Sequence, residues 1–229
     1  VEEGSWSTIN REGTTVYTGV GNRVVSVPLY SGRGLTGELA IPEEIHRIDD
    51  ATSFLINAVS IDGHLLFCQA DLKDGGYACI RINLVEGSAT ELFRTPSLMH
   101  LQLHNTEEGR LLASVVPPGD DYGIYTFDFD GKDFRRLPFT HSTNHYAALG
   151  TTEKVITTVH HGGHEIEIAT PGVDEVDILC EGPGYWHPTC DSTGEWIACD
   201  TNWPDTGLYL IHAPTGRSRV LCYPEASRV

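Results

Sequence analysis

A short pattern of strands and turns recurs along all 229 residues of the chain. Each copy reads as a small turn, an apolar strand, a polar break, a second strand and a turn that closes with glycine. The closing glycines are Gly32, Gly87, Gly131, Gly172 and Gly216, which are 55, 44, 41 and 44 residues apart. An interval of about 44 residues is typical of one propeller blade. The repeat therefore restricts the chain to architectures built from small, similar β units.

Each copy divides into four strands. In the last copy these are "YWHPTCD", "EWIACDT", "GLYLIHA" and "SRVLCY". Strand-forming residues and Gly/Asp turns fit this division, and long helical periodicity is absent. We predict an all-β fold, a single β-propeller domain of four-stranded antiparallel blades, with five blades at about 5–43, 50–96, 97–140, 142–182 and 184–224. A β-sandwich of short strands is the alternative, but the regular spacing favours a radial array.

The two ends of the repeat leave one question open. The first strand-like run is "SWSTIN" and the last is "SRVLCY", so no outer strand is left over to interlock a ring. A ring without such a clasp has an exposed edge at each end. Either the five blades close alone, or the sequence is a truncated part of a larger, seven-bladed ring.

The charge of the chain excludes some partners. There are 15 Lys and Arg against 32 Asp and Glu, which gives a net charge of −17. Such a chain is repelled by nucleic acids and by anionic membranes, so we expect neither as a partner. No apolar run approaches the roughly 20 residues of a membrane helix. An anionic ligand would need a local positive site, and the sequence predicts no particular oligomeric state.

The six cysteines show no CxxC pair, and most lie in apolar runs such as "LLFCQA" and "WIACD". This placement favours buried free thiols in a reducing compartment over disulfides. Val1 opens into polar sequence without a basic and then apolar signal region. We therefore expect a cytoplasmic protein, with the periplasm as the alternative.

Several segments carry a family resemblance. The segment "WHPTCDSTGEWIACDTNWPDTGLYLIHAPTG", taken with "VVSVPLYSG", "IPEE" and "INLVEGSATELF", resembles the oligogalacturonate lyase family. These are seven-bladed propellers that split short galacturonate oligomers by β-elimination during pectin breakdown. The resemblance follows the order of the blades over nearly the whole chain, and TolB-like propellers share its turns more distantly. Histidines on the inner strands of consecutive blades, in "STNHYAALG" and "GYWHPTC", favour the lyases.

The resemblance implies a divalent metal, typically manganese, in the central pit, and an oligogalacturonide or other small carbohydrate as ligand. His187 matches a metal ligand of the family, whose other ligands come from a blade that would follow Val229. His145 matches a member of the catalytic constellation, together with an Arg and another His from the preceding blade. The stretch "VVPPGDDYGIYTFDF" at that place has neither residue, so this sequence departs from the family pattern.

The residue types agree with chemistry on an acidic sugar. Elimination needs a base near the proton beside the carboxylate, and a histidine with a pKa of about 6.5 exchanges protons at neutral pH. His100, Gln102 and His104 are separated by even intervals, so they share one face of a strand. The residues expected to bind substrate are His100, Gln102, Asn144, Trp186, Asp200, Asn202 and Trp203. The alternative is structural: histidines hydrogen-bonded at blade mouths, and a hairpin turn in "CDTNWPDTG".

The run "VHHGGHEIEI" is a weaker candidate for metal binding. His160, His161 and His164 fall at the tip of an expected hairpin. Adjacent side chains on a strand point to opposite sides, so these histidines do not easily share one ion. We expect no metal there.

Three functions follow from these patterns. The first is a metal-assisted lyase of galacturonate oligomers, and the second is a propeller that binds a carbohydrate or a protein without catalysis. The third is a TolB-like scaffold, for which only the repeat turns argue. The fold does not decide among them. A lyase of this kind needs one divalent ion in the pit, whereas the other two need none.

Overall fold

The computed structural model describes residues 6–29, 41–97, 99–104, 109–139, 145–159, 164–201 and 206–223. These residues form five four-stranded antiparallel sheets, each built from four strands in chain order. One short 3₁₀ turn, Ala213–Thr215, is the only helical element among the described residues. No helix in these ranges is long and apolar enough to cross a membrane.

The first two sheets span residues 7–47 and 51–95. The first contains β1 (Ser7–Ile9), β2 (Thr15–Val20), β3 (Arg23–Pro28) and β4 (Glu43–Arg47), and the second contains β5 (Ala51–Val59), β6 (Leu65–Leu72), β7 (Tyr77–Asn83) and β8 (Ser88–Thr95).

The other three sheets follow between residues 102 and 222. They contain β9 (Gln102–His104), β10 (Arg110–Val115), β11 (Gly123–Asp128) and β12 (Arg135–Arg136); β13 (Tyr146–Ala148), β14 (Val155–Thr158), β15 (Glu165–Ala169) and β16 (Val176–Glu181); and β17 (Tyr185–Cys190), β18 (Trp196–Thr201), β19 (Gly207–His212) and β20 (Arg217–Cys222).

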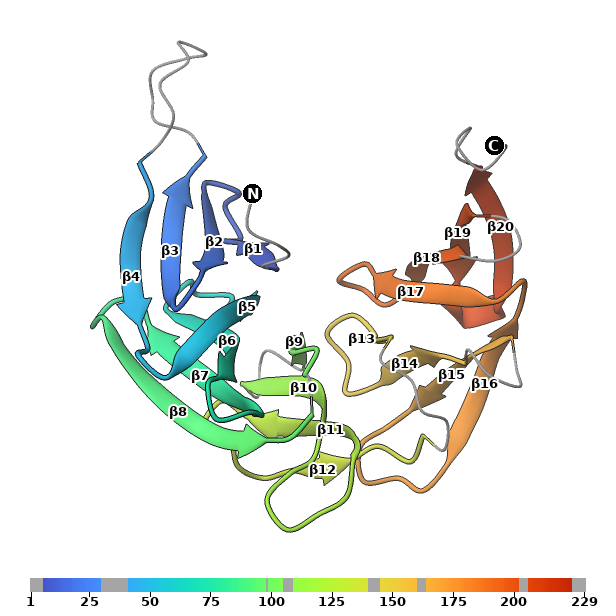
Figure 1. The fold of residues 1–229 in the computed structure, drawn as a ribbon. Helices are drawn as coiled ribbons and strands as arrows, with labels where there is room; N and C mark the ends of the chain where they lie inside the picture. Colours follow the sequence, from blue (N-terminus) through green and yellow to red (C-terminus); the bar gives the residue numbers. More distant parts are fainter. Residues whose placement is uncertain are drawn as a thin grey trace.

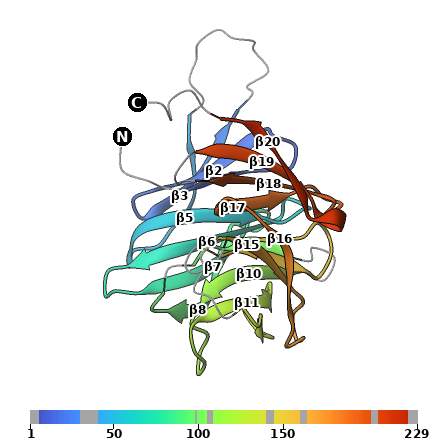
Figure 2. The same cartoon turned by 90° about the vertical axis from the view of Figure 1, so that its right-hand side faces the viewer.

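The five sheets follow one another in an arc, with β1–β4 at one end and β17–β20 at the other (Figure 1). The first strand of each sheet lies on the concave side, and neighbouring first strands touch: β1 with β5, β5 with β9, β9 with β13, and β13 with β17. Seen from the side, the strands run across the thickness of the arc (Figure 2). This radial arrangement confirms the predicted β-propeller of four-stranded blades.

The core fills the layers between neighbouring sheets, because the middle strands are covered on both faces. All six residues of β10 are buried. Phe54 and Ile56 pack with Val24 between the first two sheets, and Tyr185 and Ile211 pack between the last two. The strand sequences "LLFCQADL" and "RLLASV" are therefore nearly continuous apolar runs.

Polar contacts also join neighbouring sheets. Arg81 of β7 forms an ion pair with Asp130, which follows β11. The Cys190 thiol in β17 donates to the backbone oxygen of Ala148 in β13 at 2.7 Å. The first contact joins neighbouring sheets at their third strands, and the second joins them at their inner strands.

The glycines that define the repeat have a conformational reason. Those described have φ between +63° and +79°, a region that side chains with a Cβ rarely adopt; they are Gly87, Gly131, Gly172 and Gly216. They sit in the tight connection between the third and fourth strands of four successive sheets. Gly32, the first of the series, lies outside the described residues.

Candidate functional site

A pocket of about 510 Å³ lies where the first strands of the five sheets meet. Every sheet supplies part of its wall. Three histidines from three successive sheets face it, namely His100, His145 and His187, together with Trp6 and Gln102. Because first strands line the axis of a propeller, we call this space the axial pocket.

His187 of β17 is fixed by Asp200 of the neighbouring strand β18. Its Nδ1 lies 3.0 Å and 2.9 Å from the two carboxylate oxygens, and its backbone N–H donates to Oδ1 at 2.8 Å. An ionised carboxylate only accepts hydrogen bonds, so the ring proton belongs on Nδ1. The neutral ring therefore keeps an unprotonated Nε2 for a proton or a ligand.

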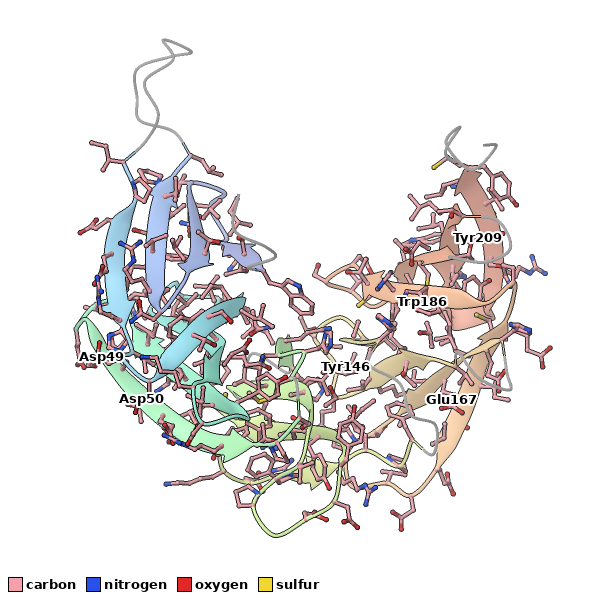
Figure 3. All side chains as sticks on the ribbon, viewed as in Figure 1. Asp49, Asp50, Tyr146, Glu167, Trp186 and Tyr209 are labelled. Carbon is pink, nitrogen blue, oxygen red and sulfur yellow. The ribbon has the colours of Figure 1, made fainter. Side chains whose placement is uncertain are left out.

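His145 stands beside His187, with the two ring centres 4.4 Å apart and the rings perpendicular. The Trp186 ring lies 5.2 Å from that of His145. Figure 3 shows Trp186 on the inner strand β17. The backbone oxygen of His145 accepts from the Thr157 hydroxyl at 3.0 Å, which anchors the start of β13.

His100 enters the pocket just before β9, and its ring centre lies 4.7 Å from that of Trp6. Burial lowers the pKa of His100, and the nearby His187 lowers it further. The His100 backbone oxygen accepts from the Tyr146 hydroxyl at 2.7 Å. Gln102 donates from Nε2 to the backbone oxygen of Tyr146 at 2.7 Å, so its amide is held across two sheets.

Two of the inner strands are irregular at the pocket. In β17 the register shifts between Tyr185 and Pro188, around His187. In β5 it shifts between Ile56 and Ala58, so Asn57 is the extra residue. Such bulges re-aim side chains and are common beside functional sites. Here they accompany two residues that line the axial pocket.

The pocket differs in charge from the rest of the molecule. The chain carries a net charge of −17. None of the described residues that line the axial pocket is acidic, and Asp200 lies behind His187. The histidine rings at the pocket suit an anionic ligand, because an imidazole N–H donates a hydrogen bond to an anion.

The structure thus brings together His100, Gln102, His145 and His187, with Asp200 and Trp186 in contact with this group. Their roles in catalysis, metal binding or substrate binding stay predictions. The remaining predicted residues, Asn144, Asn202 and Trp203, lie outside the described residues, as do His160 and His161. His164 is exposed before β15, and its backbone N–H donates to Glu165.

His104 does not belong to the pocket, although it shares its strand with Gln102. It is 1% exposed. Its Nδ1 is 3.0 Å from the Thr126 hydroxyl and its Nε2 is 2.9 Å from the backbone oxygen of Glu153. Nδ1 is used within the third sheet and Nε2 ties that sheet to the fourth, so this histidine is structural.

The described residues do not form a metal centre by themselves. Across these ranges no group of three or more His, Cys, Asp or Glu side chains is placed to hold an ion. His187 offers one nitrogen, and a carboxylate behind a histidine is the usual support for a metal ligand. One such ligand falls short of the three or four that a catalytic site provides.

Trp6 and Asn57 are pocket residues that were not predicted from the sequence. Trp6 precedes the short strand β1, and Asn57 lies between the buried residues Ile56 and Ala58 of the strand "ATSFLINAV". The signal for Asn57 was a lone amide in a run of core residues. His100, which the sequence predicted to bind substrate, gives the third sheet a pocket histidine that lies outside the segment "VVPPGDDYGIYTFDF".

Comparison with known proteins supports the fold. No protein-family model matches the sequence, and no curated protein does. Among solved structures, oligogalacturonate lyase from Vibrio parahaemolyticus is 14% identical with a TM-score of 0.70, covering 97% of this chain and 67% of that one. An oligogalacturonate lyase in complex with manganese is 12% identical with a TM-score of 0.71, covering 96% and 64%.

TolB from Acinetobacter baumannii is similar to the same degree: it is 14% identical, with a TM-score of 0.67, covering 94% of this chain and 53% of that one. The chain therefore spans about half the length of this TolB and about two thirds of the lyases. At such identities the likeness establishes the β-propeller fold alone.

Proposed function

We propose that the axial pocket binds short acidic oligosaccharides of the galacturonate type and cleaves them by β-elimination. The observation that carries this proposal is the pair His187–Asp200, which faces the pocket beside His145 and His100. An acidic sugar needs a positive or hydrogen-bonding site for its carboxylate, and this pocket offers one on a strongly acidic protein. The Trp6 ring supplies an apolar face for a sugar ring.

The elimination divides into two proton transfers. A base removes the proton from the carbon beside the carboxylate, a carbon–carbon double bond forms, and the bond to the bridging oxygen breaks. An acid then protonates the leaving oxygen. In the neutral His187 ring Asp200 holds the proton on Nδ1 and leaves Nε2 as the acceptor, which suits the base. His145, at 4.4 Å between ring centres, suits the acid. His100 would contact the carboxylate.

The test is an assay on oligogalacturonides from pectin, in which the ultraviolet absorbance of the conjugated product is followed. Reactions run with added manganese and with chelator, because the free nitrogen of His187 is also the atom that a metal would bind. His187→Ala and His145→Ala should abolish the absorbance rise. His64→Ala, on an exposed hairpin of the second sheet, is the matched control and should leave it unchanged.

A second candidate is a carbohydrate-binding propeller without catalysis. It is favoured by the stretch 115–129, which has neither the Arg nor the His that the resemblance places there. Binding measured by calorimetry in parallel separates the two functions. Binding with product formation supports the lyase, binding without product supports the second candidate, and absence of binding contradicts both.

A further inference from the structure

Asn57 carries a buried amide that has no partner. Neither its Nδ2 nor its Oδ1 has a hydrogen bond, although both atoms are shielded from water. Buried amides are nearly always paired, because an unpaired one destabilises the fold. A buried, unpaired amide beside a pocket therefore suggests that a bound ligand supplies its hydrogen-bond partners.

The backbone places this amide at the axis. Asn57 is the extra residue of the bulge in β5, where Ile56 pairs with Cys68 and Ala58 pairs with Phe67. Without the bulge, strict alternation would continue through the strand. The bulge thus coincides with Asn57, a polar residue between the buried apolar residues Ile56 and Ala58 of an inner strand.

Asn57 also stands between two spaces. A second pocket of about 370 Å³ lies further along β1, β5 and β9, next to Arg11, and Asn57 and Gln102 line both pockets. Gln102 is held by its hydrogen bond to Tyr146. Asn57 has no such tie, so its side chain can turn into either pocket without breaking a hydrogen bond.

We propose that Asn57 recognises hydroxyl groups of the bound ligand, with its Oδ1 accepting from one hydroxyl and its Nδ2 donating to the next. Neighbouring hydroxyls of a sugar ring supply both a donor and an acceptor, which matches a carboxamide. This inference rests on the proposed function, because it assumes that the axial pocket takes an oligosaccharide. In this division His100 contacts the carboxylate and Asn57 recognises the sugar hydroxyls.

The test uses Asn57→Leu, which has a similar volume and no polar atoms. Without ligand, its Tm should equal or exceed that of the wild type, because an unpaired polar group is removed. Its affinity for ligand should fall about tenfold, the loss expected for one or two hydrogen bonds. Asn83→Leu is the control: Asn83 accepts from Val85 and Glu86 in a hairpin, so this variant should lose Tm and keep its affinity.

Calorimetric titrations with trigalacturonate and with neutral galactotriose separate this inference from the proposed function. Weaker binding of either sugar by Asn57→Leu, with Tm maintained, supports the inference. Wild-type binding of the neutral sugar alone would contradict the proposed function and still test Asn57. If trigalacturonate binds and weakens with His187→Ala but not with Asn57→Leu, the inference is wrong. If neither sugar binds the wild type, both proposals are wrong.

Discussion

Replacing Tyr146 with Phe tests how the pocket is tied to the blades. Strand β9 begins at Gln102 and pairs only with Arg110–Leu112, so the backbone N–H of Ser114 has no strand partner on that side. The Tyr146 hydroxyl takes its place, accepting from Ser114 at 2.6 Å and donating to the His100 oxygen at 2.7 Å. One hydroxyl thus joins the third and fourth sheets beneath His100.

The cost of removing this hydroxyl can be worked out from those two bonds. The Ser114 amide is buried, so leaving it unpaired costs about 1–3 kcal/mol. The His100 oxygen lies beside the pocket and regains water, which leaves a loss of about 1 kcal/mol. For a domain of this size, roughly 2–4 kcal/mol lowers the Tm by about 4–16 °C.

Thermal unfolding by circular dichroism measures the effect, and Tyr125→Phe is the matched control. Tyr125 is equally buried, but its hydroxyl donates to the backbone of Asp121 in an exposed connection, where water can replace it. We expect a loss of less than about 1 kcal/mol for this variant. Equal Tm values for the two variants would refute the reasoning.

Three further outcomes follow from the same geometry. Asp200→Asn should keep the hydrogen bond to the His187 backbone N–H and so keep the Tm. It should lower any lyase rate by about tenfold or more and change the pH profile of that rate, because the amide no longer fixes the proton on Nδ1 of His187. Burial lowers the pKa of His100, so the unfolded chain takes up a proton at a higher pH than the folded one. The free energy of unfolding, measured with urea, should therefore fall as the pH drops below about 6.5, and should fall less in His100→Asn. A thiol reagent should label one cysteine quickly, the exposed Cys222, and all six after denaturation, because burial raises the pKa of thiols such as Cys199, to about 12.

The fold was predictable from the repeat because a blade is a local unit. Each sheet is made from four consecutive strands, so turn residues and strand residues in the sequence already mark it. The last repeat was divided into the strands that the structure has. Four of the six cysteines are buried and none is paired among the described residues, as the apolar runs indicated.

The site was only partly predictable, because it depends on contacts between distant residues. Inner-strand histidines were visible in the sequence, but their approach across sheets was not. His104 resembled His100 by spacing, and yet its partners Thr126 and Glu153 belong to strands and turns far along the chain. A bulge cannot be recognised from alternation alone, so the sequence did not single out Asn57.

The measurement that tests the central claim most directly is a crystal structure of the protein with trigalacturonate. We predict ligand density in the axial pocket, with a carboxylate among His100, His145 and His187 and a sugar ring against Trp6. Density on another surface of the propeller, or an empty axial pocket under conditions in which calorimetry shows binding, would contradict the claim.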